Sequence, residues 1–399
     1  MAKIVMCETL ELYNILNQCR GVPRLAEINY LCLIDANEAQ DYYRSHIITA
    51  KNAKMDSEGT FLLPELVEVD SMQHVVVYDN NTSSLQEQGR ATSCAQVFAK
   101  ASLNPVKILR GGFQRFSAQY PFLRTEKILN TIMELESLKI YPVEIIAGLL
   151  YMGDEKQSMD SNLLKDLKIS AIVSISESNT LEFIKEIHTL LITPVADSVR
   201  SDLYSSFERI CNFVSSHINM GSRVLIVSRQ GRSRASAVAI AFLIHYLKYT
   251  LKEAWTHMLK CKPIMRPNTG FLQQLSNWEL HTLGTKTTDF GLLLVGHTRT
   301  TSSRRRSEGI LVRCPNHFNC NAQAASGGDT KIPIPVHRLS SKQTPDWNRV
   351  KTLSRRLVPE PKLCVEVSLT ISRQYLSTSR TSSASFTTRE VTFHIPIAR

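Results

Sequence analysis

Short apolar runs alternate with amphipathic stretches along the first third of the chain. The runs 30–36 and 74–79 are rich in apolar residues and carry an aspartate at their carboxyl ends, and a third run covers 106–109. Continuous apolar runs of this length are typical of strands buried in a parallel sheet. Between and after them the pattern predicts helices over 37–47 and 91–102, and a turn at Gly111-Gly112. Residues 1–125 are therefore expected to form a small α/β domain.

The same alternation returns over residues 141–283, after a connecting stretch over 126–140. One predicted helix places Leu203, Phe207 and Ile210 on a single face, as a helix packed on a sheet requires. The predicted strands are 170–176, 189–195 and 223–227, and the predicted helices are 203–218, 235–248, 251–260 and 271–283. The pattern predicts a second α/β domain, so the fold class is α/β with two sheets, each flanked by helices.

The last segment, 284–399, has a different composition. About a quarter of its residues are Ser or Thr, and it lacks a sustained helical period. Chains that cannot bury enough apolar surface stay unfolded, so a mostly disordered basic tail is expected here.

The charge of the chain resides in that tail. The whole sequence has a net charge of +11, and the tail holds 18 Lys and Arg against 7 Asp and Glu, so residues 1–283 are balanced. The two domains therefore have no overall attraction for nucleic acid or anionic membrane, and only weak nucleic-acid contact through Arg304-Arg305-Arg306 is expected.

The apolar runs, the first residues and the cysteine spacing predict where the protein resides and whether it holds a metal. No apolar run is long enough for a transmembrane helix, and the first residues resemble neither a secretory signal nor a transit peptide. The nine cysteines include no C-x-x-C pair. The sequence thus predicts reduced thiols, a cytoplasmic protein, and neither metal nor cofactor.

The stretch from Val227 to Ala235 carries the strongest chemical signal. It connects an apolar strand to an apolar helix, and such a loop directs several amides and the positive end of the helix dipole at one point. Gly231 allows the backbone to curve tightly, and the planar fork of Arg234 fits two phosphate oxygens. The predicted phosphate-binding residues are Ser228, Arg229, Gln230, Gly231, Arg232, Ser233 and Arg234. The alternative is an ordinary connection with surface arginines.

This stretch resembles the H-C-x-x-G-x-x-R-[S/T] signature of protein-tyrosine and dual-specificity phosphatases. Residues 141–154 resemble the opening of a dual-specificity domain, and residues 266–275 resemble its closing segment. Asp197 stands where that family keeps its general acid. The resemblance covers about 141–283 and implies the phosphatase fold.

Three departures from the signature remove its chemistry. Ser228 replaces the nucleophilic cysteine, Val227 replaces the histidine, and Ala235 replaces the hydroxyl residue after the arginine. The mechanism requires a thiolate, whereas a serine hydroxyl stays protonated without a neighbouring base. His217 and His245 lie on predicted helices with no reason to face the loop. We therefore expect no catalysis, with Asp197 as a loop carboxylate or a capping group.

Two alternatives stay open at this point. Besides a non-catalytic protein that binds phosphate through this loop, the sequence allows a weakly active dual-specificity phosphatase, or an adaptor whose loop is retained for packing and binds no anion. If the loop does bind phosphate, phosphoserine, phosphothreonine and phosphotyrosine are all candidate ligands.

Residues 33–53 and 106–123 resemble the rhodanese-like domain found ahead of MAP-kinase-phosphatase catalytic domains. An active rhodanese has its sulfur-carrying cysteine where this chain has Asp79, and a carboxylate cannot accept sulfur. Cys94, on the following helix, is expected to be a buried small residue. The family's docking arginines are not clustered here, so the sequence does not favour MAP-kinase docking. The basic residues in that region are Arg20, Arg24, Arg44, Lys51 and Lys54.

The combination resembles rhodanese-containing pseudophosphatases. That resemblance implies a regulator that binds phosphoproteins or phosphatases. It further implies links to a stress-granule assembly protein, to a mitochondrial phosphatase that it restrains, and to apoptosis, with a mitochondrial pool beside the cytoplasmic one. The resemblance ends near Gly284.

Overall fold

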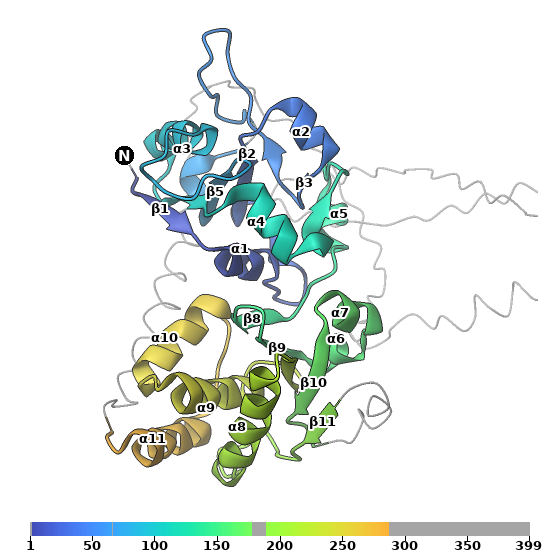
Figure 1. Ribbon diagram of the computed structural model, residues 1–399, viewed down its shortest axis with the longest axis vertical. Coiled ribbons are helices and arrows are strands. Elements are labelled where there is room, and N and C mark those ends of the chain that lie inside the picture. Colours follow the sequence, from blue (N-terminus) through green and yellow to red (C-terminus); the bar gives the residue numbers. More distant parts are fainter. Residues whose placement is uncertain (1, 66, 178–188, 287–399) are drawn as a thin grey trace, which may run out of the picture. The chain divides into compact units, whose positions relative to one another are not determined.

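The structure, a computed structural model, describes residues 2–65, 67–177 and 189–286. These residues form two sheets, each flanked by helices (Figure 1), and they belong to one compact unit. The α/β class expected from the apolar pattern is confirmed. The predicted disorder of 284–399 concerns a segment that, beyond residue 286, lies outside the described residues.

The N-terminal sheet has five strands in the order β1-β6-β5-β2-β4, and all its pairings are parallel. The apolar runs identified in the sequence form β2, β5 and β6, and β5 is buried from Val75 onward. The strand bounds are β1 (Ile4–Cys7), β2 (Leu31–Asp35), β4 (Lys51–Asn52), β5 (His74–Tyr78) and β6 (Val106–Leu109).

The helices of this domain begin and end close to the predicted positions, with one correction. The helix expected over 37–47 spans only Ala39–Arg44, because His46 and Ile47 form β3, which pairs with β7 (Arg124–Thr125) in a small antiparallel sheet. The other elements are α1 (Thr9–Leu16), η1 (Arg24–Ala26), α2 (Ala39–Arg44), η2 (Val69–Ser71), α3 (Arg90–Ala101), α4 (Gly112–Gln119) and η3 (Pro121–Leu123).

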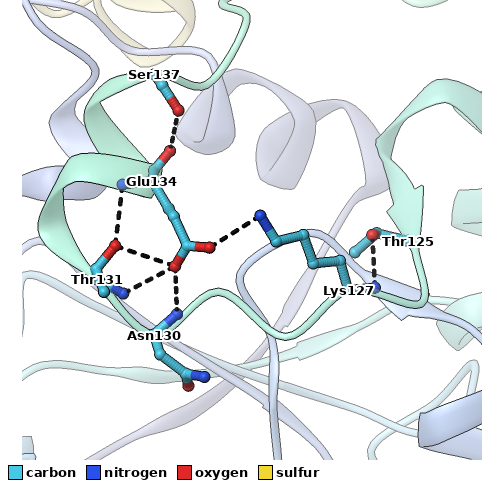
Figure 2. A network of polar contacts seen from close by, with 6 residues as sticks. All are labelled: Thr125, Lys127, Asn130, Thr131, Glu134 and Ser137. Atoms are coloured by element: carbon cyan, nitrogen blue, oxygen red, sulfur yellow. Dashed lines mark hydrogen bonds and ion pairs between the residues drawn. The ribbon is translucent and has the colours of Figure 1, made fainter. Parts of the chain in front are cut away.

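The connecting stretch contains a short helix, α5 (Ile132–Glu136), whose start is fixed by a capping box. Thr131 Oγ1 accepts from the Glu134 amide, and the Glu134 carboxylate accepts from the Thr131 amide, as Figure 2 shows. The same carboxylate pairs with Lys127 at 2.8 Å, and this contact, with the backbone bonds, lowers the pKa of Glu134 to about 2. The linker is thus locally structured at neutral pH.

The C-terminal sheet has the order β11-β10-β12-β9-β8. Its pairings are parallel except at the β8 edge, where β8 and β9 form an antiparallel hairpin. The bounds are β8 (Val143–Ile146), β9 (Leu150–Asp154), β10 (Ile169–Ser174), β11 (Thr189–Ile192) and β12 (Arg223–Ser228).

Helix α9 (Arg234–Leu247) is the central helix of this domain and packs against α8, α10 and α11 (Figure 1). Every residue of α9 from Arg234 to Ile244 is buried, which accounts for its almost unbroken apolar sequence. The remaining helices are α6 (Glu155–Met159), α7 (Ser161–Asp166), α8 (Tyr204–Asn219), α10 (Leu251–Cys261) and α11 (Thr269–Leu283).

Three apolar clusters form the core. One lies between the C-terminal sheet and helices α8–α11, and another lies under α3 of the N-terminal domain. The third joins the two domains, because it contains Tyr13 and Tyr120 from the first and Tyr141, Tyr151 and Val227 from the second. Within the described ranges, no helix combines the length and the apolar character that a bilayer span requires.

Candidate functional site: the loop between β12 and α9

The loop 229–233 lies at the carboxyl edge of the C-terminal sheet. It leaves β12 at Ser228 and enters α9 at Arg234. Strand β12 is flanked by β10 and β9, so Ser228 lies in register with Asp154, the last residue of β9. Ligand sites of parallel α/β sheets form at this edge, where loops meet helix N-termini.

Gly231 is the residue that allows the loop its close approach to the sheet. Its φ is +59°, and a Cβ at this position would lie 2.3 Å from the carbonyl oxygen of Gly153. The Gly231 amide donates to the Ser228 carbonyl at 3.0 Å, which closes the turn. Only glycine satisfies both the positive φ and the backbone contact.

The loop presents a set of free amide donors. Within the described part of the chain, the amides of Arg229, Gln230, Arg232 and Ser233 donate to no protein acceptor. Ser233, at the N-cap of α9, makes no side-chain cap bond to the helix, so the helix N-terminus is not closed by its own cap. Free amides at a helix N-terminus bind anions.

Arg234 is held in a fixed orientation beneath these amides. The residue is only 5% exposed, and its Nη1 donates to the Val195 carbonyl at 2.7 Å. Glu177 Oε1 lies 3.6 Å from the same nitrogen. Arg234 Nε is buried and has no acceptor in the described structure. Nη1 of the guanidinium is thus held by protein oxygens, whereas the buried Nε has no hydrogen-bond partner among the described residues.

The residues at the three positions that depart from the signature are buried. Val227 is fully buried within the apolar cluster that joins the domains, and Ala235 is fully buried at the start of α9. Ser228 is 2% exposed. Among the described residues, its hydroxyl oxygen makes one hydrogen bond, which it accepts from the Ala235 amide at 3.4 Å. Among the described residues, the Ser228 hydroxyl thus has no hydrogen bond to a histidine or carboxylate.

The two histidines considered from the sequence lie elsewhere. His217 packs on Phe213, with ring centroids 4.5 Å apart, and His245 stacks near Trp278 at 6.2 Å. Burial lowers the pKa of His245, which favours its neutral form. Neither ring contacts the loop residues.

Asp197 is brought to the loop by two hydrogen bonds to Oδ1. Ser233 Oγ donates to it at 2.7 Å, and Asn268 Nδ2 donates at 3.0 Å. Asn268 is also the N-cap of α11, where its Oδ1 accepts from Phe271. Among the described helices Asp197 is thus not an N-cap, and its carboxylate ties its own segment to the loop 229–233.

The segment 262–268 connects α10 to α11; residues 266–268 belong to the closing segment identified in the sequence, whereas 262–265 were not singled out. Its Arg266 amide donates to the Arg232 carbonyl at 2.7 Å, and Arg232 Nε donates to the Ile264 carbonyl at 3.4 Å. Lys262 Nζ would lie 3.1 Å from a Cβ placed on Gly231. Burial lowers the pKa of Lys262 to about 8, against a smaller opposing effect of Asp154. Lys262 lies about thirty residues after Gly231 in the sequence and approaches it only in the folded chain, so the sequence alone does not predict this position.

In the N-terminal domain, the aspartate at the rhodanese cysteine position occupies its own loop. The Asp79 carboxylate accepts from the amides of Asn81, Thr82 and Ala91 at 2.9–3.1 Å, and from Thr82 Oγ1 at 2.7 Å. Asp79 is 6% exposed. The Asp79 carboxylate thus takes up three backbone amides and the Thr82 hydroxyl around its own loop.

Cys94 and Arg24 of this domain are buried, whereas Arg44 and Lys51 are exposed. Cys94 is fully buried, and burial raises its pKa to about 12, so it is not a reactive thiolate. Arg24 is buried and pairs with Glu27 at 2.7 Å. In the described ranges, no group of three or more His, Cys, Asp or Glu side chains could hold a metal ion.

Comparison with known proteins agrees with this architecture. Residues 150–281 match the dual specificity phosphatase catalytic domain, and residues 12–119 match the rhodanese-like domain. Human dual specificity protein phosphatase 16 is 28% identical over 272 residues, covering 62% of this chain and 40% of that protein. A probable rhodanese domain-containing dual specificity protein phosphatase of Dictyostelium discoideum is 26% identical over 184 residues, covering 46% of this chain and 38% of that protein.

Among solved structures, the human tyrosine phosphatase-like serine/threonine/tyrosine-interacting protein is 23% identical, with a TM-score of 0.32. The match covers 35% of this chain and 96% of that one. The chain spans less than half the length of the two curated relatives above. Its architecture is a rhodanese-like domain followed by a dual-specificity phosphatase domain.

Proposed function

We propose that this chain is a catalytically inactive phosphatase-like regulator, a pseudophosphatase, that binds phosphorylated side chains of signalling proteins through residues 228–234. The observation that carries the proposal is the unpaired, buried Nε of Arg234 beneath a loop of free amides. A buried donor without an acceptor costs about 1–3 kcal/mol. A bound phosphate oxygen supplies that acceptor, and the arginine fork suits two such oxygens.

The inactive character rests on the nucleophile position. Phosphoryl transfer to this position needs an ionised group, and Ser228 has neither a base nor a cation-stabilised thiol. Val227 adds only apolar packing. No residue described around the loop favours the weakly active phosphatase over the binding protein.

An adaptor that binds no anion is the second candidate, and one observation favours it. The bonds of Arg234 to Val195 and Glu177 hold the loop in shape without any ligand. In that case the loop contributes stability alone.

Titration with tungstate, a phosphate-like oxyanion, separates these candidates. The wild type is expected to bind it, and Arg234→Ala is expected to weaken binding at least about tenfold, because a charge-assisted bond contributes about 1.5–3 kcal/mol. Arg44→Ala is the matched control, since Arg44 is exposed on α2. Absence of binding by the wild type would leave the adaptor.

The partners are part of the same proposal. A stress-granule assembly protein and a mitochondrial phosphatase are the candidates implied by resemblance, in a cytoplasmic protein with a mitochondrial pool. Capture experiments with the full chain and with Arg234→Ala test them, because a partner bound through the loop is lost from the variant, whereas one bound elsewhere is retained.

A further inference from the structure

Helix α1 of the rhodanese-like domain docks along the exposed side of edge strand β8. The side-chain amide of Asn14 donates to the Glu144 carbonyl and accepts from the Glu144 amide, both at 2.8 Å. Asn17 Oδ1 accepts from the Tyr141 amide at 2.9 Å, and the Tyr13 hydroxyl donates to the Pro142 carbonyl at 2.8 Å. Side chains of α1 thus satisfy backbone groups that an edge strand leaves unpaired.

A buried carboxylate reinforces this junction. Glu144 is 1% exposed and accepts hydrogen bonds from Tyr120 of the first domain and from Tyr151 of the second. The rings of Tyr13 and Tyr120 stack with centroids 4.5 Å apart. Because its polar groups are paired and its rings are packed, the junction fixes α1 relative to the second domain.

Gln18, just beyond α1, extends this docking to the end of α10. Its Nε2 donates to the carbonyl of Cys261 at 2.9 Å and to that of Asn14 at 2.7 Å, and the residue is 5% exposed. Cys261 is the last residue of α10, where a helix leaves carbonyls without an internal donor. Gln18 therefore holds the point at which the chain leaves α10.

The segment 262–268, which starts at this point, contacts the loop 229–233 directly; this loop is called the phosphate loop below, after its proposed ligand. Lys262 Nζ would lie 3.1 Å from a Cβ placed on Gly231, the Ile264 carbonyl accepts from Arg232 Nε, and the Arg266 amide donates to the Arg232 carbonyl. Further on, Asn268 bonds Asp197. A displacement of the backbone at Cys261 would therefore move the segment 262–268, which is hydrogen-bonded to Arg232 of the loop.

We propose that Gln18 of the rhodanese-like domain is a positioning residue for the phosphate loop of the second domain, acting through segment 262–268. This inference rests on the proposed function, because the ligand concerned is the phosphate group that residues 228–234 are proposed to bind. The rhodanese-like domain, whose own loop is filled by Asp79, then serves the phosphatase-like site instead of acting on a substrate.

The test uses the full chain with Gln18→Met, which keeps the length of the side chain and removes the donor. A groove of about 530 Å³ next to Gln18, lined also by Leu259 and Pro263, gives the new side chain room. Gln119→Met, at an exposed position of α4, is the control. Tungstate affinity and amide hydrogen exchange are measured well below the unfolding temperature.

Gln18→Met is expected to weaken tungstate binding about two- to tenfold, in the range of one lost hydrogen bond. It is also expected to accelerate exchange at residues 229–235, while the control changes neither. Exchange that changes only around α1 and α10 would overturn the positioning role. If the wild type binds no tungstate, the proposed function fails, and the exchange data still decide whether Gln18 holds the loop.

Discussion

The hydroxyl of Ser233 lies 2.7 Å from Asp197 Oδ1, so the segment that carries Asp197 is held against the loop 229–233. The same segment approaches α11 closely, because a Cβ placed on Gly270 would lie 2.0 Å from the Val199 carbonyl oxygen. Asp197 is thus held against the loop that follows Ser228, the residue proposed to occupy the nucleophile's position without reacting.

This arrangement predicts that chemistry can be restored at the loop. The variant Val227→His, Ser228→Cys, Ala235→Ser is expected to hydrolyse an aryl phosphate, because a cysteine at a helix N-terminus ionises below its usual pKa. The double variant without Ala235→Ser is expected to be slower, since it lacks the hydroxyl that stabilises the thiolate. Turnover of purified, folded protein is the measurement.

In that restored background, Asp197→Asn is expected to lower kcat by about 100-fold or more, the usual contribution of a general acid. Glu58→Gln, at an exposed position of the first domain, is the control and leaves kcat unchanged. A folded but inert triple variant would show that the assignment of the loop or of Asp197 is wrong.

Gly231 and Gly221 form a matched pair for testing the close approach of the loop. Both have positive φ, +59° and +77°, but only Gly231 lies against backbone, whereas nothing lies within 4 Å of a Cβ at Gly221. Gly221→Ala is expected to cost about 1–2 kcal/mol of unfolding free energy from the left-handed conformation alone. Gly231→Ala is expected to cost clearly more and to abolish tungstate binding.

Denaturant unfolding monitored for both variants checks this expectation. Equal losses of stability in the two variants would mean that the Gly153 contact relaxes freely and does not constrain the loop.

Lys262 gives the loop a pH dependence with a definite sign. Its folded pKa of about 8 lies below the ordinary value of 10.5, so the unfolded chain binds more protons between these values. The free energy of unfolding therefore rises with pH between about 8 and 10.5, because Lys262 loses its unfavourable charge in the folded protein over this range. Lys262→Met is expected to be more stable than the wild type at pH 7 and to lose that advantage over this range.

Thermal unfolding at a series of pH values measures the effect, with the exposed neighbour in Lys260→Met as the control. A stability difference between wild type and Lys262→Met that does not change between pH 7 and 10.5 would contradict the assigned cause.

The sequence predicted the sheets well where burial dominates. The runs that became β2, β5, β10 and β12 are continuous and apolar because both faces of a parallel strand are covered. The helix over 37–47 was predicted too long, since His46 and Ile47 pair with residues almost eighty positions away. No local pattern reports such a pairing.

The loop residues were also visible from the sequence, because strand, glycine, arginine and helix occur within a few positions. The tether of Asp197 to Ser233, the position of Lys262 and the docking of Asn14 and Gln18 were not visible. Each depends on side chains that are distant in sequence and meet only in the folded chain, and a single sequence holds no signal for such pairs.

The central claim, binding without hydrolysis, is tested most directly by titrating the full chain with a phosphotyrosine peptide while free phosphate is measured in the same sample. The account predicts saturable binding that Arg234→Ala removes, with no phosphate released. Phosphate release that depends on Arg234 would contradict it.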